Sequence, residues 1–169
     1  MQTRYSLDIY TDGACSHNKK GNWSGGYGVY VDGYPEYTTY GYDINTTNNK
    51  MELTALLKAL EIIDKGNFIH QDINIYTDSA YIYNCIKQGW YIKWRKNGWE
   101  TAKHKPVKNK KLWQQILSLY EKYNNINIVK VKGHSNVVGN IKADQLAVKG
   151  RDEAASKEIL NDPYNALLD

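Results

Sequence analysis

Cysteine, phenylalanine, proline and long apolar runs are all scarce in this chain of 169 residues. The two cysteines, Cys15 and Cys85, have no metal-ligand spacing, so we interpret both as reduced core residues and expect no zinc site. No apolar run reaches the roughly 18 residues that cross a membrane, and the start of the chain lacks the apolar core of a signal peptide. We therefore expect a cytoplasmic protein with no membrane partner. Hydrophobic residues make up 41% of the chain, which predicts one domain with its own core.

The net charge of +4 is distributed unevenly along the chain. Between Lys87 and Lys111 there are nine Lys or Arg and one acid, Glu100, which gives this segment a charge of +8 and leaves −4 for the rest. An acidic body with a basic appendage is typical of proteins that bind a polyanion. We therefore expect a nucleic-acid partner for the basic segment.

Hydrophobic periodicity predicts an alternation of strands and helices. The expected strands are at 4–12, around 29–31, and at 36–44, 73–77 and 126–131, and the expected helices are at 50–66, 79–88, 108–123 and around 143–147. The first three strands are expected to form a meander, with Gly13 ending the first strand. One face of the first helix is apolar and contains Met51, Ala55, Leu56, Ala59, Leu60 and Ile63. Because a crossover helix lies between two strands, those two strands are expected to run parallel.

The first and fourth strands contain an internal echo. Ile9-Tyr10-Thr11-Asp12-Gly13-Ala14 has the same pattern as Ile75-Tyr76-Thr77-Asp78-Ser79-Ala80. Each strand therefore leads into an aspartate at the same register. If the strands are parallel neighbours, the carboxylates of Asp12 and Asp78 lie side by side at the carboxyl edge of the sheet, where open α/β sheets place their sites.

Each acid of this region has a plain structural interpretation when it is taken alone. Glu52 follows Asn49 by three residues, as in a capping box. Asp12 precedes a glycine, as a turn residue does, and Asp78 precedes Ser79, as a helix cap would. Together, however, three acids near one end of a sheet repel one another, and a fold keeps them only if cations offset the repulsion. We therefore favour a metal site over three unrelated structural roles.

These acids present only oxygen ligands, which favour hard cations such as Mg²⁺ or Mn²⁺ over zinc. Two such ions about 4 Å apart can activate a water and stabilise the leaving oxygen in phosphodiester cleavage. Asp144, on the last helix, would complete the ligand set. His134, ten residues earlier on a glycine-containing loop, could shuttle a proton or help the product leave. The alternative for His134 is a surface histidine beside a glycine turn.

Four short blocks form one ordered set along the chain. They are Thr11–Ala14, Thr47–Leu53, Thr77–Ser79, and Val131–His134 with Asn140, Ala143 and Asp144. In this order they resemble the type 1 ribonuclease H family, over a region from Arg4 to Gly150. The resemblance implies an α/β fold of the ribonuclease H type. That fold is a five-stranded mixed sheet, with a three-stranded antiparallel meander, two parallel strands and helices on both faces.

The basic segment combines cations with tryptophans. Its pattern is Trp90–Trp99, then Lys105–Asn109 and Leu112–Trp113. This pattern resembles the basic protrusion, or handle, of the bacterial members of the family, at about 87–111. Cationic side chains contact phosphates, while Trp faces can contact sugars. Trp90 and Trp94 are four apart and share a helical face, so the alternative of a solvated charge run with core tryptophans fits Trp113 better than this pair.

By this resemblance the chain would cleave the RNA strand of an RNA/DNA hybrid and leave 3′-hydroxyl and 5′-phosphate ends. Asp12, Glu52, Asp78 and Asp144 match the acids that bind two Mg²⁺ ions, or Mn²⁺ in their place, and His134 matches a mobile-loop histidine. Asn18, Asn48 and Asn49 match residues that contact the minor groove and the RNA 2′-hydroxyls, and Thr47 matches a DNA phosphate contact. The substrate-binding residues of the handle would be Trp90, Lys93, Trp94, Arg95 and Lys96. Recognition through groove shape and 2′-hydroxyls makes cleavage largely independent of base sequence.

The expected domain comprises residues 1–156, and 157–169 form a polar tail without an assignment. A monomer is expected. Two other functions stay open, a non-catalytic hybrid-binding module that uses only the handle, and a related 3′-to-5′ exonuclease. Such exonucleases usually have Asp-x-Glu on their first strand, whereas this chain has Asp12-Gly13-Ala14, which argues against them.

Overall fold

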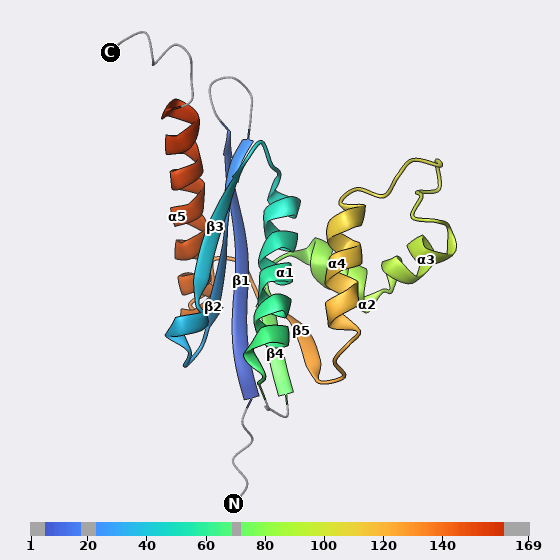
Figure 1. Ribbon diagram of the computed structural model, residues 1–169, viewed down its shortest axis with the longest axis horizontal. Coiled ribbons are helices and arrows are strands. Elements are labelled where there is room, and N and C mark those ends of the chain that lie inside the picture. Colours follow the sequence, from blue (N-terminus) through green and yellow to red (C-terminus); the bar gives the residue numbers. More distant parts are fainter. Residues whose placement is uncertain (1–5, 18–22, 69–71, 161–169) are drawn as a thin grey trace, which may run out of the picture.

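A five-stranded mixed sheet forms the centre of the structure (Figure 1). The computed structural model describes residues 6–17, 23–68 and 72–160. The strands are β1 (Ser6–His17), β2 (Trp23–Val31), β3 (Thr39–Ile44), β4 (Asp72–Thr77) and β5 (Ile126–Lys130). In the order β3-β2-β1-β4-β5, the first three pair antiparallel, and β4 pairs parallel with both β1 and β5. The expected meander and the two parallel strands are confirmed.

Helices cover both faces of this sheet, as expected. They are α1 (Asn48–Gly66), α2 (Ala80–Lys87), α3 (Trp90–Lys96), α4 (Lys110–Tyr120) and α5 (Val138–Leu160), with a 3₁₀ helix, η1, at Pro35–Tyr37. Figure 1 shows α1 against one face with α4 outside it, α3 farther out, and α5 against the other face. Within the described ranges, no helix has the length and apolar composition that a bilayer crossing needs.

The core lies between α1 and the sheet. Leu7 and Ile9 of β1 and Ile73 and Ile75 of β4 are buried on that side, and they alternate with half-buried polar or aromatic residues. The predicted apolar face of α1 is confirmed, because all six of its residues are buried: Met51, Ala55, Leu56, Ala59, Leu60 and Ile63. Cys85 is buried as expected. The prediction for the other cysteine is wrong, since it lies near the C-terminal end of β1 and is only half-buried.

Gly13 does not end β1, in contrast to the prediction. The strand continues to His17 because residues 13–17 pair antiparallel with residues 23–27 of β2. Gly13 has a different role, since a Cβ on it would lie 2.7 Å from the backbone nitrogen of Glu52. Its missing side chain lets α1 pack directly on β1. This close approach brings the second turn of α1 next to Asp12.

Three other segments differ in detail from the expected elements. The tyrosine-rich run at 36–44 is divided into η1 and β3, because Pro35 starts a 3₁₀ turn. The last helix extends over Val138–Leu160 and so includes the first residues of the unassigned tail. Within the basic segment, residues 90–96 form α3, a helix that is absent from the expected elements. It places Trp90 and Trp94 one turn apart, as their spacing predicts.

Two glycines of β2 let α5 pack directly on the sheet. A Cβ on Gly26 would lie 2.2 Å from the carbonyl oxygen of Ala147, and a Cβ on Gly28 would lie 2.4 Å from that of Ala143. Asp144 lies between these two contacts along the helix. The glycines therefore set the distance between the sheet and the helix that carries Asp144.

Gly26→Ala is expected to lower the free energy of unfolding by about 3 kcal/mol, because its methyl group would collide with the backbone of α5. Urea unfolding measures this loss. Gly33→Ala is the control, since Gly33 has a φ of +82° and nothing within 4 Å of an added methyl. It should lose only its backbone preference, about 1 kcal/mol. Equal losses in the two variants would contradict the packing explanation.

Candidate active site

Asp12 and Asp78 lie side by side at the ends of two parallel strands, as the sequence echo predicts. The register pairs Ile9 with Ile75 and Tyr10 with Tyr76. Two residues further along β1 is Asp12, and the corresponding Asp78 comes directly after β4. The two carboxylates therefore meet at the carboxyl edge of the sheet, where this class of fold places its sites.

None of the three acids has the structural role that its sequence neighbours suggest. Thr47 is the N-cap of α1 and accepts a hydrogen bond from the first turn, so Glu52 lies in the second turn and outside a capping box. Ser79, not Asp78, caps α2 with its side chain. Asp12 lies within β1 and not in a turn. The turn and cap interpretations are therefore wrong, and the three carboxylates are available for another role.

Three carboxylates converge at this edge of the sheet. One oxygen each from Asp12, Glu52 and Asp78 lies within 4.8 Å of the other two. Asp12 is only 5% exposed and accepts a hydrogen bond from the N–H of Gly13 at 2.9 Å. Oε2 of Glu52 is buried and has no hydrogen-bond partner among the described residues. An anionic oxygen without a partner is costly to bury, and a cation between the carboxylates would compensate for this cost.

Burial and repulsion favour the protonated forms of Asp12 and Glu52 when no cation is present. Burial, and after it repulsion by Asp78, raises the pKa of Asp12 to about 8. Burial, with repulsion by Asp12 and Asp78, raises the pKa of Glu52 well above its usual value. A divalent cation bound by these oxygens would reverse both effects. The residues present fit a hard cation, because the cluster contains only carboxylate oxygens.

Two of the three carboxylates, Asp12 and Asp78, open into a pocket of about 260 Å³. Its lining comprises Asp12, Asp78, His134, Ser135, Asn140, Ile141 and Asp144. Asp144, contributed by α5, lies close enough to Asp12 to influence its pKa, although it is outside the tight cluster of three. Asn140 was not predicted as a site residue, yet it is buried and lies one helical turn before Asp144. That spacing of four residues is the signal that places both on one helix face.

His134 lies at the rim of this pocket, on the loop between β5 and α5. Its side chain is exposed, and its backbone has a φ of +56°. A Cβ on the preceding Gly133 would lie 3.3 Å from Oδ2 of Asp78. The loop therefore passes directly beside the carboxylates, and the structure brings His134 together with them.

The residues matched to groove contacts lie at the start of α1. Thr47, Asn48 and Asn49 are all exposed, and Thr47 also caps the helix. Glu52 follows on the next turn, so this helix end joins an exposed polar surface to the carboxylate cluster. Asn18 lies outside the described residues.

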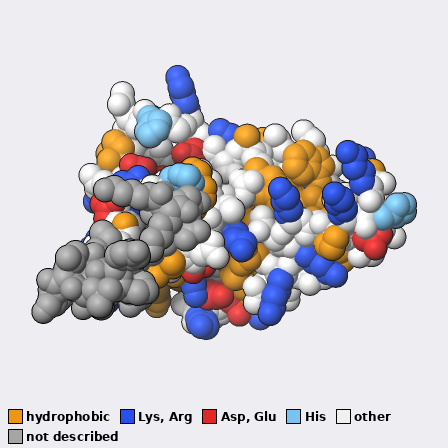
Figure 2. All heavy atoms as spheres, turned by 90° about the horizontal axis from the view of Figure 1, so that it is seen from above, with side chains coloured by type: hydrophobic (Ala, Val, Ile, Leu, Met, Phe, Trp, Pro, Cys, Tyr) orange, Lys and Arg blue, Asp and Glu red, His pale blue; other side chains and the backbone are white. Residues whose placement is uncertain are grey.

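The lysines and tryptophans of the handle have different environments. Lys93 and Lys96 are exposed, and Figure 2 shows Lys and Arg side chains spread over the part of the surface that carries α3 and α4. Trp94 instead packs with Trp99 and Trp113, at ring-centroid distances of 5.9 Å to each. Trp113 is fully buried, which confirms its interpretation as a core tryptophan.

Trp90 and Arg95 also have partners inside the protein. The indole N–H of Trp90 donates to Oε1 of Gln88 at 2.8 Å. Arg95 forms a two-pronged ion pair with Glu121 of the α4 C-terminus. The structure thus brings the five handle residues together on one helix. Its three cations are all exposed, and Lys93 and Lys96 are the two for which no acidic partner is described.

Known proteins are similar in sequence to this chain over most of its length. The family model described as RNase H matches residues 4–152. The chain belongs to the RNase H family. Ribonuclease H of Prosthecochloris aestuarii is 44% identical over 145 residues, which cover 85% of this chain and 94% of that protein. Ribonuclease H of Orientia tsutsugamushi is 42% identical over 165 residues, which cover 96% of this chain and 92% of that protein.

The RNase H fold is also found in a solved structure, described as LC9-RNase H1, a type 1 RNase H with the type 2 active-site motif. That structure has a TM-score of 0.73 and 22% identity, and it covers 99% of this chain and 86% of its own. At this identity the likeness concerns the fold alone. The family that the four sequence blocks predict is confirmed, and the chain is a ribonuclease H enzyme.

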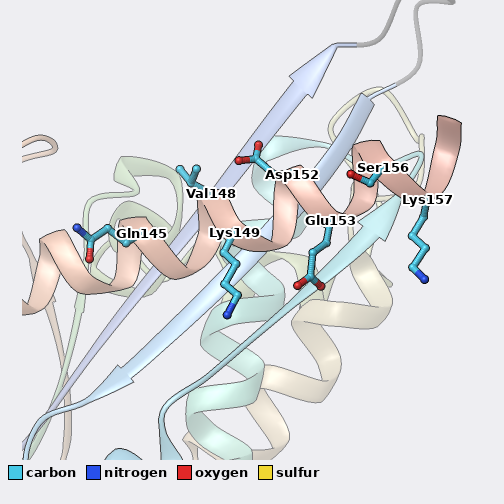
Figure 3. A pocket seen from close by; sticks show the side chains of 7 residues that line it. All are labelled: Gln145, Val148, Lys149, Asp152, Glu153, Ser156 and Lys157. Atoms are coloured by element: carbon cyan, nitrogen blue, oxygen red, sulfur yellow. The ribbon is translucent and has the colours of Figure 1, made fainter. Parts of the chain in front are cut away.

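A larger hollow, of about 830 Å³, lies along α5 and is separate from the RNase H pocket. Figure 3 shows that its lining side chains all come from α5, namely Gln145, Val148, Lys149, Asp152, Glu153, Ser156 and Lys157. Glu153 accepts a hydrogen bond from the Tyr40 hydroxyl at 2.6 Å, and Lys149 lies 4.7 Å from the centroid of the Tyr40 ring. These two contacts link α5 to β3, and none of the clustered carboxylates lines the hollow.

The raised pKa of Asp12 predicts how pH affects the stability of the metal-free RNase H. The folded state binds this proton more tightly than the unfolded state, so stability present below about pH 4 is lost as the pH rises towards about 8. Asp12→Asn removes the loss. In EDTA, the free energy of unfolding of this variant should exceed that of the wild type by on the order of 2 kcal/mol at about pH 8.5 and by little at about pH 5.

Urea unfolding at both pH values measures this difference. Asp152→Asn, which removes an exposed carboxylate from α5, is the control for the loss of one charge. A gain that is the same at both pH values, or that the control reproduces, would show that burial of charge at Asp12 is not its cause. Adding Mg²⁺ should restore stability to the wild type at the higher pH and do less for Asp12→Asn.

Proposed function

We propose that this ribonuclease H hydrolyses the RNA strand of RNA/DNA hybrids and leaves 3′-hydroxyl and 5′-phosphate ends. The observation that carries the proposal is the convergence of Asp12, Glu52 and Asp78 within 4.8 Å of one another, in a chain of the RNase H family. Carboxylates in this arrangement suit the divalent cations that phosphodiester hydrolysis uses. The pocket beside them reaches the protein surface at its rim, where His134 is exposed.

Two divalent cations, Mg²⁺ or Mn²⁺ in its place, would be held by Asp12, Glu52, Asp78 and Asp144. When bound, they supply positive charge to the phosphate and make a water more acidic. The protein orients the ligand oxygens in advance. The N–H of Gly13 fixes one oxygen of Asp12, and α1 holds a buried oxygen of Glu52 that lacks a partner among the described residues. Because these positions are set before a cation binds, little reorganisation is needed.

We assign His134 to proton transfer at the rim of the pocket. An imidazole can accept and release a proton under physiological conditions. The loop of His134 passes beside Asp78, and its exposed side chain can reach a strand lying across the carboxylates or a departing product. In the alternative, a surface histidine beside a glycine turn, removal of the imidazole would leave turnover unchanged.

The start of α1 and the handle are assigned to the substrate. Thr47, Asn48 and Asn49 are exposed next to the carboxylates, where they can contact phosphate and groove, and Asn18 is assigned to the same task. Trp90, Lys93, Trp94, Arg95 and Lys96 form the handle surface, in which the exposed lysines are suited to phosphates. Contacts to backbone and 2′-hydroxyls select a hybrid by its shape and not by its base sequence.

Two alternatives fit the structure less well. A module that only binds hybrids has no use for a cluster of buried carboxylates, which repel phosphates. An exonuclease with Asp-x-Glu would need an acid at Ala14, the next residue of β1 on the same face as Asp12. We also propose that the enzyme acts in the cytoplasm. We propose further that it acts as a monomer, because one chain supplies every residue that lines the pocket.

Asp78→Asn is expected to lower hybrid cleavage in Mg²⁺ by on the order of 10³-fold while hybrid binding persists, because the amide keeps the shape of the side chain but not its charge. Cleavage of a hybrid labelled on its RNA strand measures turnover, and fluorescence anisotropy measures binding. Asp152→Asn, on an outer turn of α5, is the matched control and should cleave as the wild type does.

Undiminished cleavage by Asp78→Asn, or no cleavage by the wild type, would refute the proposed activity. Binding without turnover in the wild type would indicate a hybrid-binding module. A hybrid whose RNA ends are both blocked distinguishes the third possibility, because an exonuclease cannot degrade it and an endonuclease can.

Replacing Lys93 and Lys96 together by Ala is expected to weaken hybrid binding equally for hybrids of different sequence. The slope of log K against log salt concentration should fall by about 2, since each lost phosphate contact releases about one counterion fewer. The control replaces Lys58 and Lys65 of α1, which removes the same charge from another surface. If both pairs lose the same affinity, total charge and not the handle governs binding.

A further inference from the structure

Of the three cations on α3, Arg95 is the one for which the structure describes an acidic partner. Its guanidinium meets the Glu121 carboxylate with both terminal nitrogens, Nη1 to Oε2 at 3.0 Å and Nη2 to Oε1. Its Cζ lies 5.4 Å from the centroid of the Tyr91 ring. A two-pronged contact of this kind fixes direction as well as distance. The N–H groups of the guanidinium are therefore bound by Glu121, and its planar face lies over the Tyr91 ring.

Glu121 is a firm anchor because it terminates α4. Its N–H donates to the carbonyl oxygens of Leu117 and Leu119, which fixes the backbone that carries the carboxylate. The helix itself is held to the body of the protein by Trp113, Ile116 and Leu117, all buried, and it packs on α1. The Arg95–Glu121 pair thus joins α3 to the core across 26 residues of sequence.

Apart from this pair, the contacts that orient α3 come from aromatic side chains on one side of the helix, since Trp90, Tyr91 and Trp94 are half-buried and pack against the core. The helix begins after Gly89, whose φ is +67°, has no side-chain cap and contains no buried residue. Seven residues are too few for a helix that is stable by itself. Trp94 attaches one side of it to the rings of Trp99 and Trp113. These aromatic contacts hold one side of the helix, and the directional Arg95–Glu121 pair fixes the rotation of its last turn, which carries Lys93 and Lys96.

We propose that Arg95 is a positioning residue, which acts through Glu121 to set the rotation of α3 and so directs Lys93 and Lys96 toward the hybrid. This inference rests on the proposed function of the handle. According to this proposal an acidic residue, Glu121, strengthens the binding of a polyanion. Charge alone predicts the opposite, because removing an acid should strengthen the attraction of a phosphate backbone.

Glu121→Gln separates these two expectations. The amide keeps the size of the side chain and removes the ion pair, so Kd and KM for a hybrid should rise by roughly three- to tenfold with kcat unchanged, and the salt slope should fall by about 1. Glu100→Gln is the matched control. That side chain lies in the handle and is 50% exposed, against 44% for Glu121, but its described ionic partner is the nearby His104. The control should bind as tightly as the wild type or more tightly.

Two further variants test the geometry of the pair. Arg95→Lys keeps the charge but not the fork, so it should lose about as much affinity as Glu121→Gln, whereas a direct phosphate contact would tolerate lysine. The reversed pair, Arg95→Glu with Glu121→Arg, restores an ion pair at unchanged net charge. It should recover affinity to within about threefold of the wild type.

Three results would overturn the proposal. They are wild-type or tighter binding by Glu121→Gln, wild-type binding by Arg95→Lys, and a reversed pair no better than the weaker single variant. Urea unfolding accompanies each measurement, and an affinity loss that follows a loss of stability also counts against it. Exposed pairs contribute little to stability, so none is expected. A wild type that binds hybrid without cleaving it would refute the proposed activity and leave this comparison of affinities intact.

Discussion

Mutual repulsion among carboxylates sheltered from water sets the requirements that the rest of this fold meets. Such a cluster persists only where rigid elements hold each side chain and a cation can enter. Parallel pairing of β1 with β4 fixes two of the acids at one edge, and the missing side chain of Gly13 lets α1 bring Glu52 to the same place. On the other face, Gly26 and Gly28 let α5 approach until Asp144 reaches the pocket. Backbone close approach, and not side-chain packing alone, positions the acids.

The sequence predicted those parts of this arrangement for which a pattern has only one physical interpretation. The echo between the first and fourth strands gives their register directly, and the apolar spacing of α1 gives its buried face. Gly13 has two possible meanings, because a glycine after a strand can end it or can admit another backbone. Glu52 is also ambiguous. Its spacing of three residues from Asn49 suggests a capping box, but the helix is capped by Thr47, so the spacing has no such meaning here. A sequence does not show which distant backbone comes near, so these choices could not be made from it.

Contacts between distant residues are the part of the site least visible in a sequence. Counted by composition, Arg95 is one of nine cations in a segment of charge +8 and looks equivalent to its neighbours. In the structure, Glu121 binds its guanidinium from the end of another helix, while no acidic partner is described for Lys93 and Lys96. The tryptophans are equally hard to interpret from sequence. The spacing of Trp94 from Trp90 suggests a substrate-contacting face, yet in the structure Trp94 packs against Trp113. Charge and aromatic content indicate that a handle exists, but only packing shows which of its residues support it.

Charge also couples the two halves of the proposed mechanism. In the proposed mechanism, the carboxylate pocket without cations would repel the phosphate backbone that the handle would attract, so the two surfaces would oppose each other. Cations held by the acids would convert this repulsion into attraction, and by thermodynamic reciprocity a bound hybrid would raise the affinity for those cations by the same factor. The handle then needs a fixed orientation, because only a backbone held at a set distance presents a phosphate to the neutralised carboxylates. An acidic pocket alone would reject its substrate, and a basic handle alone would hold a hybrid without cleaving it.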